Sequence, residues 1–291
     1  MATIAFIGVG NMGGGMAANL VKAGYRVQAF DLSPEALDAA AAKGCVRCGT
    51  AREAVQSVDA VVTMLPNGSI VDSFYRDNVF GHAPSAAMLL DCSTIDVATA
   101  QGVATAAEVA GYIMADAPVS GGIGAAEAGS LTFMVGASVA GFAAAQPILS
   151  AMGKAVIHAG GVGAGQAAKI CNNMILGATM IATCEAFALA EKLGLDAQKF
   201  YDIASVSSGQ NWSMTSYCPV PGVGPKSPAD NDYQGGFAAA LMLKDLKLAM
   251  GAAQAVDADT PMGAQAERLY DAFVAAGSGA SDFSAIIKTL Q

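Results

Sequence analysis

The sequence predicts a two-part α/β protein, in which a doubly wound parallel sheet is followed by an all-α region that one long helix joins to it. Three observations carry this prediction. Short apolar runs alternate with Ala-rich helical stretches over the first 160 residues, a glycine-rich turn follows the first run, and the alternation then stops. Alternating strands and helices are typical of a parallel sheet that helices cover on both faces.

Seven apolar runs have the length and composition of buried strands. They are residues 3–7, 26–30, 60–63, 88–90, 113–115, 131–135 and 155–157. Helices are expected between most of them, chiefly over 11–23, 34–42, 96–110 and 138–150. The uncharged stretch 128–153 is long enough to span a membrane, but its glycines, serines and Pro147 indicate a buried strand, a turn and a helix instead. We therefore predict no membrane association.

A glycine cluster at 160–165 separates the two parts. Residues 166–193 contain no proline and one interior glycine, Gly177, which predicts a helix about 42 Å long. Only helices are expected after it, interrupted by a loop over 219–228. The sequence thus divides into a sheet domain, 1–161, and a helical domain, 162–291, that opens with the long helix.

Composition narrows the classes of function. The chain of 291 residues is 54% hydrophobic and 13% charged, which excludes disorder. A net charge of −9 argues against nucleic-acid binding. The two histidines, His82 and His158, are too few and too far apart for a metal site. The six cysteines lack a framework pattern and no export signal follows Met1, so we expect reduced thiols in a cytoplasmic protein.

The turn Gly8-x-Gly10-x-x-Gly13 lies between the first strand and the first helix. Its glycines allow a tight turn, a close approach of pyrophosphate and close packing of the helix on the sheet, as in a Rossmann-type domain. Asp31 ends the next strand, 18 residues after Gly13, where a carboxylate binds an adenosine ribose and repels a 2′-phosphate. Leu32 stands where a phosphate-binding arginine would be expected. The sequence predicts NAD rather than NADP, although Asp31 could instead cap the following helix.

Four segments together resemble the β-hydroxyacid dehydrogenase family. They are residues 6–20, 116–122, 163–173 and 244–246, and they are spread over the whole chain. The resemblance implies an enzyme that oxidises a small 3-hydroxy acid with NAD, with a branched C4 acid as the expected substrate. It also implies cofactor contacts beyond the glycines and Asp31, at Asn11, Met12, Leu65, Pro66, Thr94 and Lys244.

Lys169 and Asn173 are the catalytic residues that the resemblance implies, together with Ser120. Their spacing of four residues places Lys169 and Asn173 on one face of the long helix. Lys169 would act as general acid and base on the substrate hydroxyl, and Asn173 would orient that hydroxyl. Without the resemblance, the alternative is a lysine that caps a domain interface.

The expected substrate contacts come from several segments. Ser120 and the backbone N–H groups of Gly121 and Gly122 would bind a carboxylate, although an ordinary glycine turn is the alternative. Trp212, the single tryptophan, and Phe237 would form apolar walls, unless they only pack between domains.

Other functions stay open. Phosphogluconate-type relatives are disfavoured because no arginine lies between Arg76 and Arg268 to bind a phosphate. Enzymes acting on tartronate semialdehyde, succinic semialdehyde or serine share the core motifs, whereas imine-reducing relatives generally lack the lysine. A non-catalytic NAD-binding scaffold or sensor is the alternative of another class. The apolar helices of the second part predict a homodimer or homotetramer.

Overall fold

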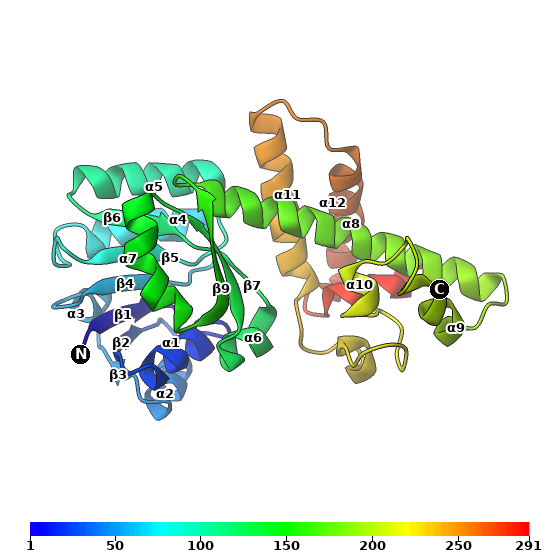
Figure 1. Cartoon of the computed structure of the whole chain (residues 1–291), viewed down its shortest axis with the longest axis horizontal. Coiled ribbons are helices and arrows are strands. Elements are labelled where there is room, and N and C mark those ends of the chain that lie inside the picture. Colours follow the sequence, from blue (N-terminus) through cyan, green and yellow to red (C-terminus); the bar gives the residue numbers. More distant parts are fainter. Residues whose placement is uncertain (291) are drawn as a thin grey trace. The chain divides into compact units, whose positions relative to one another are not determined.

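The computed structural model describes residues 1–290 and divides into two compact units, Met1–Lys169 and Ile170–Gln291. The first unit contains a nine-stranded sheet with flanking helices, and the second is helical (Figure 1). The strands are β1 (Thr3–Ile7), β2 (Arg26–Phe30), β3 (Val46–Arg47), β4 (Ala60–Thr63), β5 (Met88–Asp91), β6 (Ile113–Asp116), β7 (Val119–Ser120), β8 (Leu131–Gly136) and β9 (Gly153–Gly160).

The helices of the first unit connect these strands and follow the predicted pattern closely. They are α1 (Gly13–Lys22), α2 (Pro34–Ala42), α3 (Ala51–Ala54), α4 (Gly68–Phe74) with the π-helical η1 (Tyr75–Val79), α5 (Val97–Val109), α6 (Gly122–Ala128) and α7 (Val139–Ser150). Helix α1 begins two residues later than predicted, because residues 8–12 form the turn that precedes it. The stretch 128–153 is a strand, a turn and a helix, as predicted.

The strand order is β3-β2-β1-β4-β5-β6-β8-β7, with β9 paired to β8. Strands β1 to β6 are parallel, and their register is continuous at the carboxyl end: Ile7 pairs with Phe30 and with Thr63, and Asp91 pairs with Thr63 and with Asp116. The order reverses between β1 and β4, the switch point at which open α/β sheets bind ligands. The loops after β1, β2, β4, β5 and β6 therefore emerge at one edge.

The sheet departs from the prediction in two ways. The two-residue strands β3 and β7 were not predicted. At the side of the sheet with β7, β8 pairs antiparallel with both β6 and β7, although a parallel sheet was predicted. Two-residue strands are too short to show a hydrophobic period. Only ten residues connect β7 to β8, which is less than a parallel crossover needs, so this pair is antiparallel.

Helices cover both faces of the sheet, as the alternation of strands and helices predicted. On one face α1, α2 and α7 pack on side chains such as Phe6, Val62 and Leu90. On the other face α3, α4 and α5 pack on the alternate residues, such as Ile7, Val61 and Leu89. Each strand thus contributes to both cores, which explains why its sequence is apolar without interruption.

The long helix α8 (Ala164–Lys192) begins in the first unit and continues into the second. The second unit also contains α9 (Ala197–Ala204), α10 (Trp212–Thr215), η2 (Pro228–Asn231), α11 (Ala239–Ala255), α12 (Pro261–Phe273), η3 (Val274–Ser278) and η4 (Phe283–Thr289). Its core includes Phe187 of α8, Leu246 of α11 and Tyr270 of α12. By length and composition α8 could cross a membrane, a test that the core helix of a globular protein also passes, and half of its most apolar stretch is buried.

Candidate functional site

The glycine turn after β1 has the geometry that a pyrophosphate needs. Gly8 has φ +87°, and a Cβ added there would lie 2.2 Å from the Met64 carbonyl oxygen. A Cβ at Gly13 would lie 1.9 Å from the Gly8 carbonyl oxygen, so both positions require glycine. At Gly10, by contrast, an added Cβ would meet nothing within 4 Å. The backbone at Gly10 is therefore open to a ligand, and α1 begins with no side-chain cap on its N–H groups, which is the arrangement that binds phosphate.

Asp31 follows β2 and does not cap the helix that comes after it, α2. The cap of α2 is Ser33, whose Oγ accepts from Ala36 N at 3.2 Å. Asp31 Oδ1 accepts from Ser33 N at 2.9 Å, which fixes the carboxylate at the sheet edge while Oδ2 takes no part in that bond. Leu32, the next residue, is 91% exposed and has no charged group that could bind a phosphate. The capping alternative for Asp31 is therefore wrong, and ribose binding by Asp31 stays a prediction.

A buried carboxylate, Asp91, organises the loops that follow β4 and β5. Its Oδ1 accepts from Thr63 Oγ1 at 2.7 Å and from Ser93 Oγ at 2.6 Å. Ser93 Oγ in turn accepts from Leu65 N at 2.8 Å. The predicted cofactor residues Leu65, Pro66 and Thr94 thus belong to two loops that this network joins. Sequence reasoning missed Asp91, although a lone aspartate that ends an apolar strand is a visible signal.

The turn after β7 contains Ser120, Gly121 and Gly122. Gly121 and Gly122 have φ +133° and +71°, conformations that favour glycine. Asn19, also missed, ties this segment to the glycine turn: its Nδ2 donates to Ala126 O of α6 at 2.7 Å and to Gly15 O of α1 at 3.0 Å. Both turns therefore belong to one rigid part of the first unit.

Asp116, at the end of β6, caps the start of α8. Its Oδ1 accepts from Gly163 N at 2.7 Å and its Oδ2 from Gln166 N at 2.8 Å. Burial raises the pKa of Asp116 to about 6, against the opposing effect of these backbone bonds. Added Cβ atoms at Gly136 and Gly165 would lie 2.3 and 2.7 Å from the two carboxylate oxygens, so the chain leaves this space for the carboxylate alone.

Gln166 attaches the first turn of α8 to the loop after β5. Its side chain is fully buried, donates from Nε2 to Ser93 O at 2.8 Å and accepts at Oε1 from Ile95 N at 3.1 Å. These two bonds bracket Thr94. Lys169 follows Gln166 by one turn and is buried, with 8% of its surface exposed. Asp116 and Gln166 thus fix the helical turn that bears Lys169 beside the end of β6 and the loop after β5.

In the second unit, Asn173 and Lys244 meet at Asp245. Asn173 Nδ2 donates to Asp245 Oδ2 at 2.5 Å, and its Oδ1 accepts from Asn172 Nδ2 at 3.0 Å. Lys244 Nζ lies 3.9 Å from Asp245 Oδ1. These contacts hold the Asn173 amide in one orientation. Asp245 is buried, and sequence reasoning gave it no role.

Trp212 and Phe237 lie in one aromatic cluster of the second unit. Trp212 begins α10, is 51% exposed and stacks on Tyr217 with 5.0 Å between ring centroids. Phe237 packs edge-on against Phe283 at 5.8 Å.

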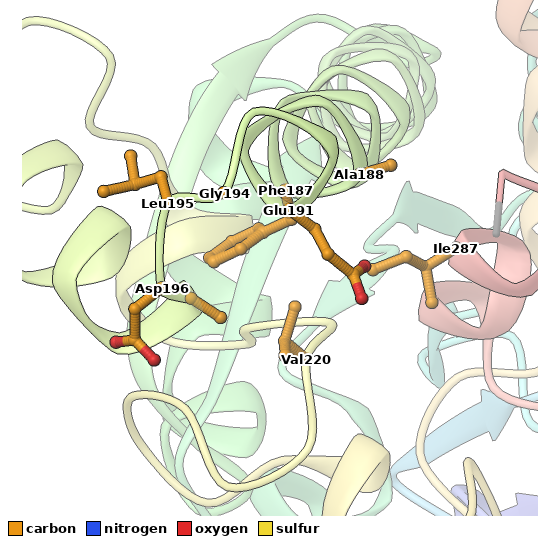
Figure 2. Close-up of a pocket in the computed structure, with 9 residues that line it drawn as sticks. Phe187, Ala188, Glu191, Gly194, Leu195, Asp196, Val220 and Ile287 are labelled. Atoms are coloured by element: carbon orange, nitrogen blue, oxygen red, sulfur yellow. The ribbon is translucent and has the colours of Figure 1, made fainter.

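A separate cavity of about 480 Å³, between α8, α9 and the loop over 219–228, is lined by Phe187, Glu191, Asp196 and Val220 among others (Figure 2). None of the predicted site residues lines that cavity.

Comparisons with known proteins agree with these motifs. Residues 3–161 match the family model described as the NAD-binding domain of 6-phosphogluconate dehydrogenase. Residues 163–290 match the one described as NAD-binding of NADP-dependent 3-hydroxyisobutyrate dehydrogenase.

Curated relatives match along the whole chain. The chain is 49% identical to a probable 3-hydroxyisobutyrate dehydrogenase of Mycobacterium tuberculosis, over 100% of this chain and 98% of the relative. It is 48% identical to a 3-hydroxyisobutyrate dehydrogenase of Pseudomonas aeruginosa, over 99% and 98%. An NAD-dependent L-serine dehydrogenase of the same organism is 46% identical, over 99% and 97%.

A solved structure agrees with the fold of both units. The structure described as Mycobacterium tuberculosis 3-hydroxyisobutyrate dehydrogenase with L-serine covers 100% of this chain and 99% of its own, with a TM-score of 0.96 and 49% identity. Full-length matches at this level of identity establish the family. The chain belongs to the NAD-binding β-hydroxyacid dehydrogenase family, the family of the 3-hydroxyisobutyrate dehydrogenases.

Proposed function

We propose that this chain oxidises 3-hydroxyisobutyrate to methylmalonate semialdehyde with NAD+, a step of valine breakdown. The observation that supports this most strongly is the full-length match, at 49% and 48% identity, to two relatives that are named for this activity.

The cofactor site that we propose is the carboxyl edge of β1, β2, β4 and β5. NAD+ supplies the acceptor for the hydride that leaves the substrate carbon. The turn with Gly8, Gly10 and Gly13 would bind the pyrophosphate, with Asn11 and Met12 inside it. Asp31 would accept hydrogen bonds from the adenosine ribose. Further contacts would come from the loops with Leu65, Pro66 and Thr94, and from Lys244.

A cofactor exchange tests the role of Asp31. The native protein should prefer NAD+ because a 2′-phosphate would meet the Asp31 carboxylate, while Leu32 offers no charge. The double variant Asp31→Asn with Leu32→Arg should move kcat/KM toward NADP+, and Leu32→Ala alone should not. Equal kcat/KM values for the two cofactors in the native protein would contradict the assignment.

Lys169 is the proposed general acid and base. In its neutral form the Lys169 amine would take the hydroxyl proton as the hydride leaves the adjacent carbon, and in reverse the ammonium would return it. Asn173 would orient the hydroxyl through the amide hydrogen and lone pair that its partners leave available. Asp116 and Gln166 hold the turn that bears Lys169, and Asp245 holds Asn173.

The remaining contacts define the substrate. Ser120 and the N–H groups of Gly121 and Gly122, aided by Lys244, would bind the carboxylate. Trp212 and Phe237 would contact the methyl group. Since one methyl group in an apolar pocket is worth about 1–3 kcal/mol, kcat/KM for 3-hydroxyisobutyrate should exceed that for 3-hydroxypropionate roughly 10- to 200-fold. Measuring kcat/KM for both acids and for L-serine, with NAD+ under one set of conditions, tests the assignment.

L-serine is the second candidate substrate. It is favoured by the relative named NAD-dependent L-serine dehydrogenase and by the solved structure described with L-serine. Against it, the serine ammonium would lose its hydration on replacing the methyl group in a pocket that we propose to be apolar. A kcat/KM for L-serine above that for 3-hydroxyisobutyrate would reverse this preference while leaving the dehydrogenase chemistry in place.

We also propose that the boundary between the cofactor-binding domain and the helical domain lies between residues 161 and 162. We further propose that the protein is cytoplasmic and forms a homodimer or homotetramer. The two family models meet near that boundary, at residues 161 and 163. Exposed apolar side chains on and after α8, at Ile175, Leu189 and Leu193, offer a surface that an oligomer would cover. Light scattering on the purified protein would give the number of subunits, and a monomer would contradict the proposal.

A further inference from the structure

A buried carboxylate lies behind the aromatic cluster of the second unit. Asp282 has no exposed surface. Its Oδ2 accepts from Tyr217 Oη at 2.8 Å and from the backbone N of Phe237 at 2.8 Å. Its Oδ1 accepts from Ser284 N at 3.0 Å and from Ser284 Oγ at 2.5 Å. One side chain thus joins three segments that are far apart in the sequence.

The space around this carboxylate is closed. Gly236 has φ +69°, and a Cβ added there would lie 2.2 Å from Asp282 Oδ2 and 2.4 Å from Tyr217 Oη. Backbone bonds lock the same segments, because Asp282 N donates to Tyr233 O at 2.9 Å and Phe283 N donates to Phe237 O at 2.8 Å. Burial raises the pKa of Asp282, and its four hydrogen bonds act in the opposite direction. A buried acceptor with four donors holds those donors in one geometry.

Aromatic ring contacts connect the residues bonded to Asp282 with Trp212. The Tyr217 ring, fixed at its hydroxyl, stacks on Trp212 with an interplanar angle of 21°. Tyr217 also packs on Phe283 at 5.5 Å, and Phe283 packs edge-on against Phe237. Trp212 is half-exposed, so part of its surface is available to a ligand. Asp282 therefore controls both proposed walls of the methyl pocket, although it is too deeply buried to touch a substrate.

We propose that Asp282 is a specificity-positioning residue, which fixes Trp212 through the Tyr217 hydroxyl and Phe237 through its backbone N–H. The surface that it holds in place is the one on which the methyl group of the substrate packs. This assignment of the surface to the methyl group depends on the proposed function, whereas the positioning of the two aromatic side chains does not.

Fluorescence tests the positioning without any substrate. Trp212 is the single tryptophan of the chain, so emission excited at wavelengths that tyrosine does not absorb reports on this residue alone. Tyr217→Phe keeps the ring and removes the hydroxyl that donates to Asp282, and Asp282→Asn removes the charge. Both variants should lower the anisotropy of Trp212 and raise its quenching by acrylamide. The matched control is Tyr112→Phe, which removes a buried hydroxyl bonded to Ala83 O in the other unit and should leave both signals unchanged.

Selectivity tests the consequence for the substrate. The ratio of kcat/KM for 3-hydroxyisobutyrate over 3-hydroxypropionate should fall at least about fivefold in Tyr217→Phe, from the roughly 10- to 200-fold range that one methyl group allows. It should fall further in Asp282→Asn and stay at the native value in Tyr112→Phe. A general loss of folding would lower both kcat/KM values alike and leave their ratio unchanged.

The outcomes separate the two proposals. If the native protein does not oxidise 3-hydroxyisobutyrate, the proposed function is wrong, and the fluorescence still decides whether Asp282 holds Trp212. If the native protein prefers 3-hydroxyisobutyrate but Tyr217→Phe keeps the native ratio and the native Trp212 anisotropy, the positioning role is overturned. Should Asp282→Asn fail to fold, Tyr217→Phe alone decides between these outcomes, because it deletes one hydroxyl and leaves the carboxylate satisfied by its other donors.

Discussion

Asp116 in the first unit and Asp282 in the second are both buried carboxylates, yet they bond different kinds of group. Asp116 accepts from two backbone N–H groups at the start of α8, so it fixes the main chain that carries Lys169. Asp282 accepts from a tyrosine hydroxyl, a serine and the N–H of Phe237, so it fixes an aromatic surface. The first arrangement should govern the rate of the chemical step. The second should govern the choice between substrates.

The largest expected effect lies at Lys169, the residue that the Asp116 cap would serve. Lys169→Ala should lower kcat at least about a hundredfold, the low end for a general acid and base. NAD+ should still bind, because the glycine turn is untouched, and titration calorimetry would show this. Lys192→Ala, at the far end of the same helix, is the control and should retain native kcat. Turnover near the native rate in Lys169→Ala would mean that this lysine is structural. Asp116 would then have no catalytic lysine to position.

The Asp116 cap itself should give the next largest effect. In Asp116→Asn an amide NH2 faces one of the two backbone donors, so α8 loses a charge-assisted bond and its first turn shifts. A misplacement of catalytic groups on the scale of 1 Å can cost about a hundredfold, and we expect a loss of about ten- to a hundredfold in kcat. The selectivity for 3-hydroxyisobutyrate over 3-hydroxypropionate should stay unchanged, which is the reverse of the result expected for Asp282→Asn.

Asp96→Asn is the matched control for this substitution. Asp96 also caps a helix of the first unit, accepting from Thr99 N at 2.7 Å, but that helix, α5, bears no proposed catalytic residue. Both variants should be destabilised, and only Asp116→Asn should lose kcat. Equal kcat values in the two variants would show that capping α8 matters for stability alone.

The sequence predicts local features of this molecule and misses those that depend on distant partners. The glycine turn could be recognised, and a role for Asp31 could be predicted, because both depend on spacing within one βαβ unit. The roles of Asp116 and Asp282 could not, because they depend on donors that lie 47 and 65 residues away, at Gly163 and Tyr217. A lone aspartate that ends an apolar strand signals a buried polar contact, but only the strand register shows which segment it meets.

A glycine substitution tests the second half of the comparison more finely. Gly236→Ala places a methyl group against Asp282 and Tyr217, whereas Gly235→Ala, at φ +81°, meets no atom within 4 Å. Both variants force alanine into a left-handed conformation, which costs about 1–2 kcal/mol, and only Gly236→Ala must also displace the carboxylate. Thermal and urea unfolding should show the larger loss for Gly236→Ala, and its substrate selectivity should fall as in Tyr217→Phe. Identical stability and selectivity in the two variants would mean that the closed space around Asp282 has no energetic role.

The smallest expected effect is the pH dependence of stability that Asp116 imposes. Burial, and to a lesser extent the charge of Asp91, raises the pKa of this carboxyl from its ordinary value of 3.8 to about 6 in the folded state. A carboxyl with a raised folded-state pKa contributes stability below its unfolded pKa and loses that contribution as pH rises through 6. Between about pH 4.5 and pH 7 the contribution should therefore fall by about 2 kcal/mol, from the shift at about 1.4 kcal/mol per pKa unit.

Asp116→Asn isolates this contribution from those of the other carboxylates. The difference in free energy of unfolding between the native protein and the variant should be larger near pH 4.5 than near pH 7, which urea titrations at the two pH values would measure. For Asp282→Asn, the loss in free energy of unfolding relative to the native protein should also be larger near pH 4.5 than near pH 7, because burial raises the pKa of that carboxyl too. A difference that is equal at both pH values would mean that the pKa of Asp116 is the same in the folded and unfolded states, and a difference that is larger at the higher pH would mean that folding lowers it. The backbone N–H groups of α8 would then balance or outweigh the effect of burial, and the cap would be charged across the whole range in which the enzyme works.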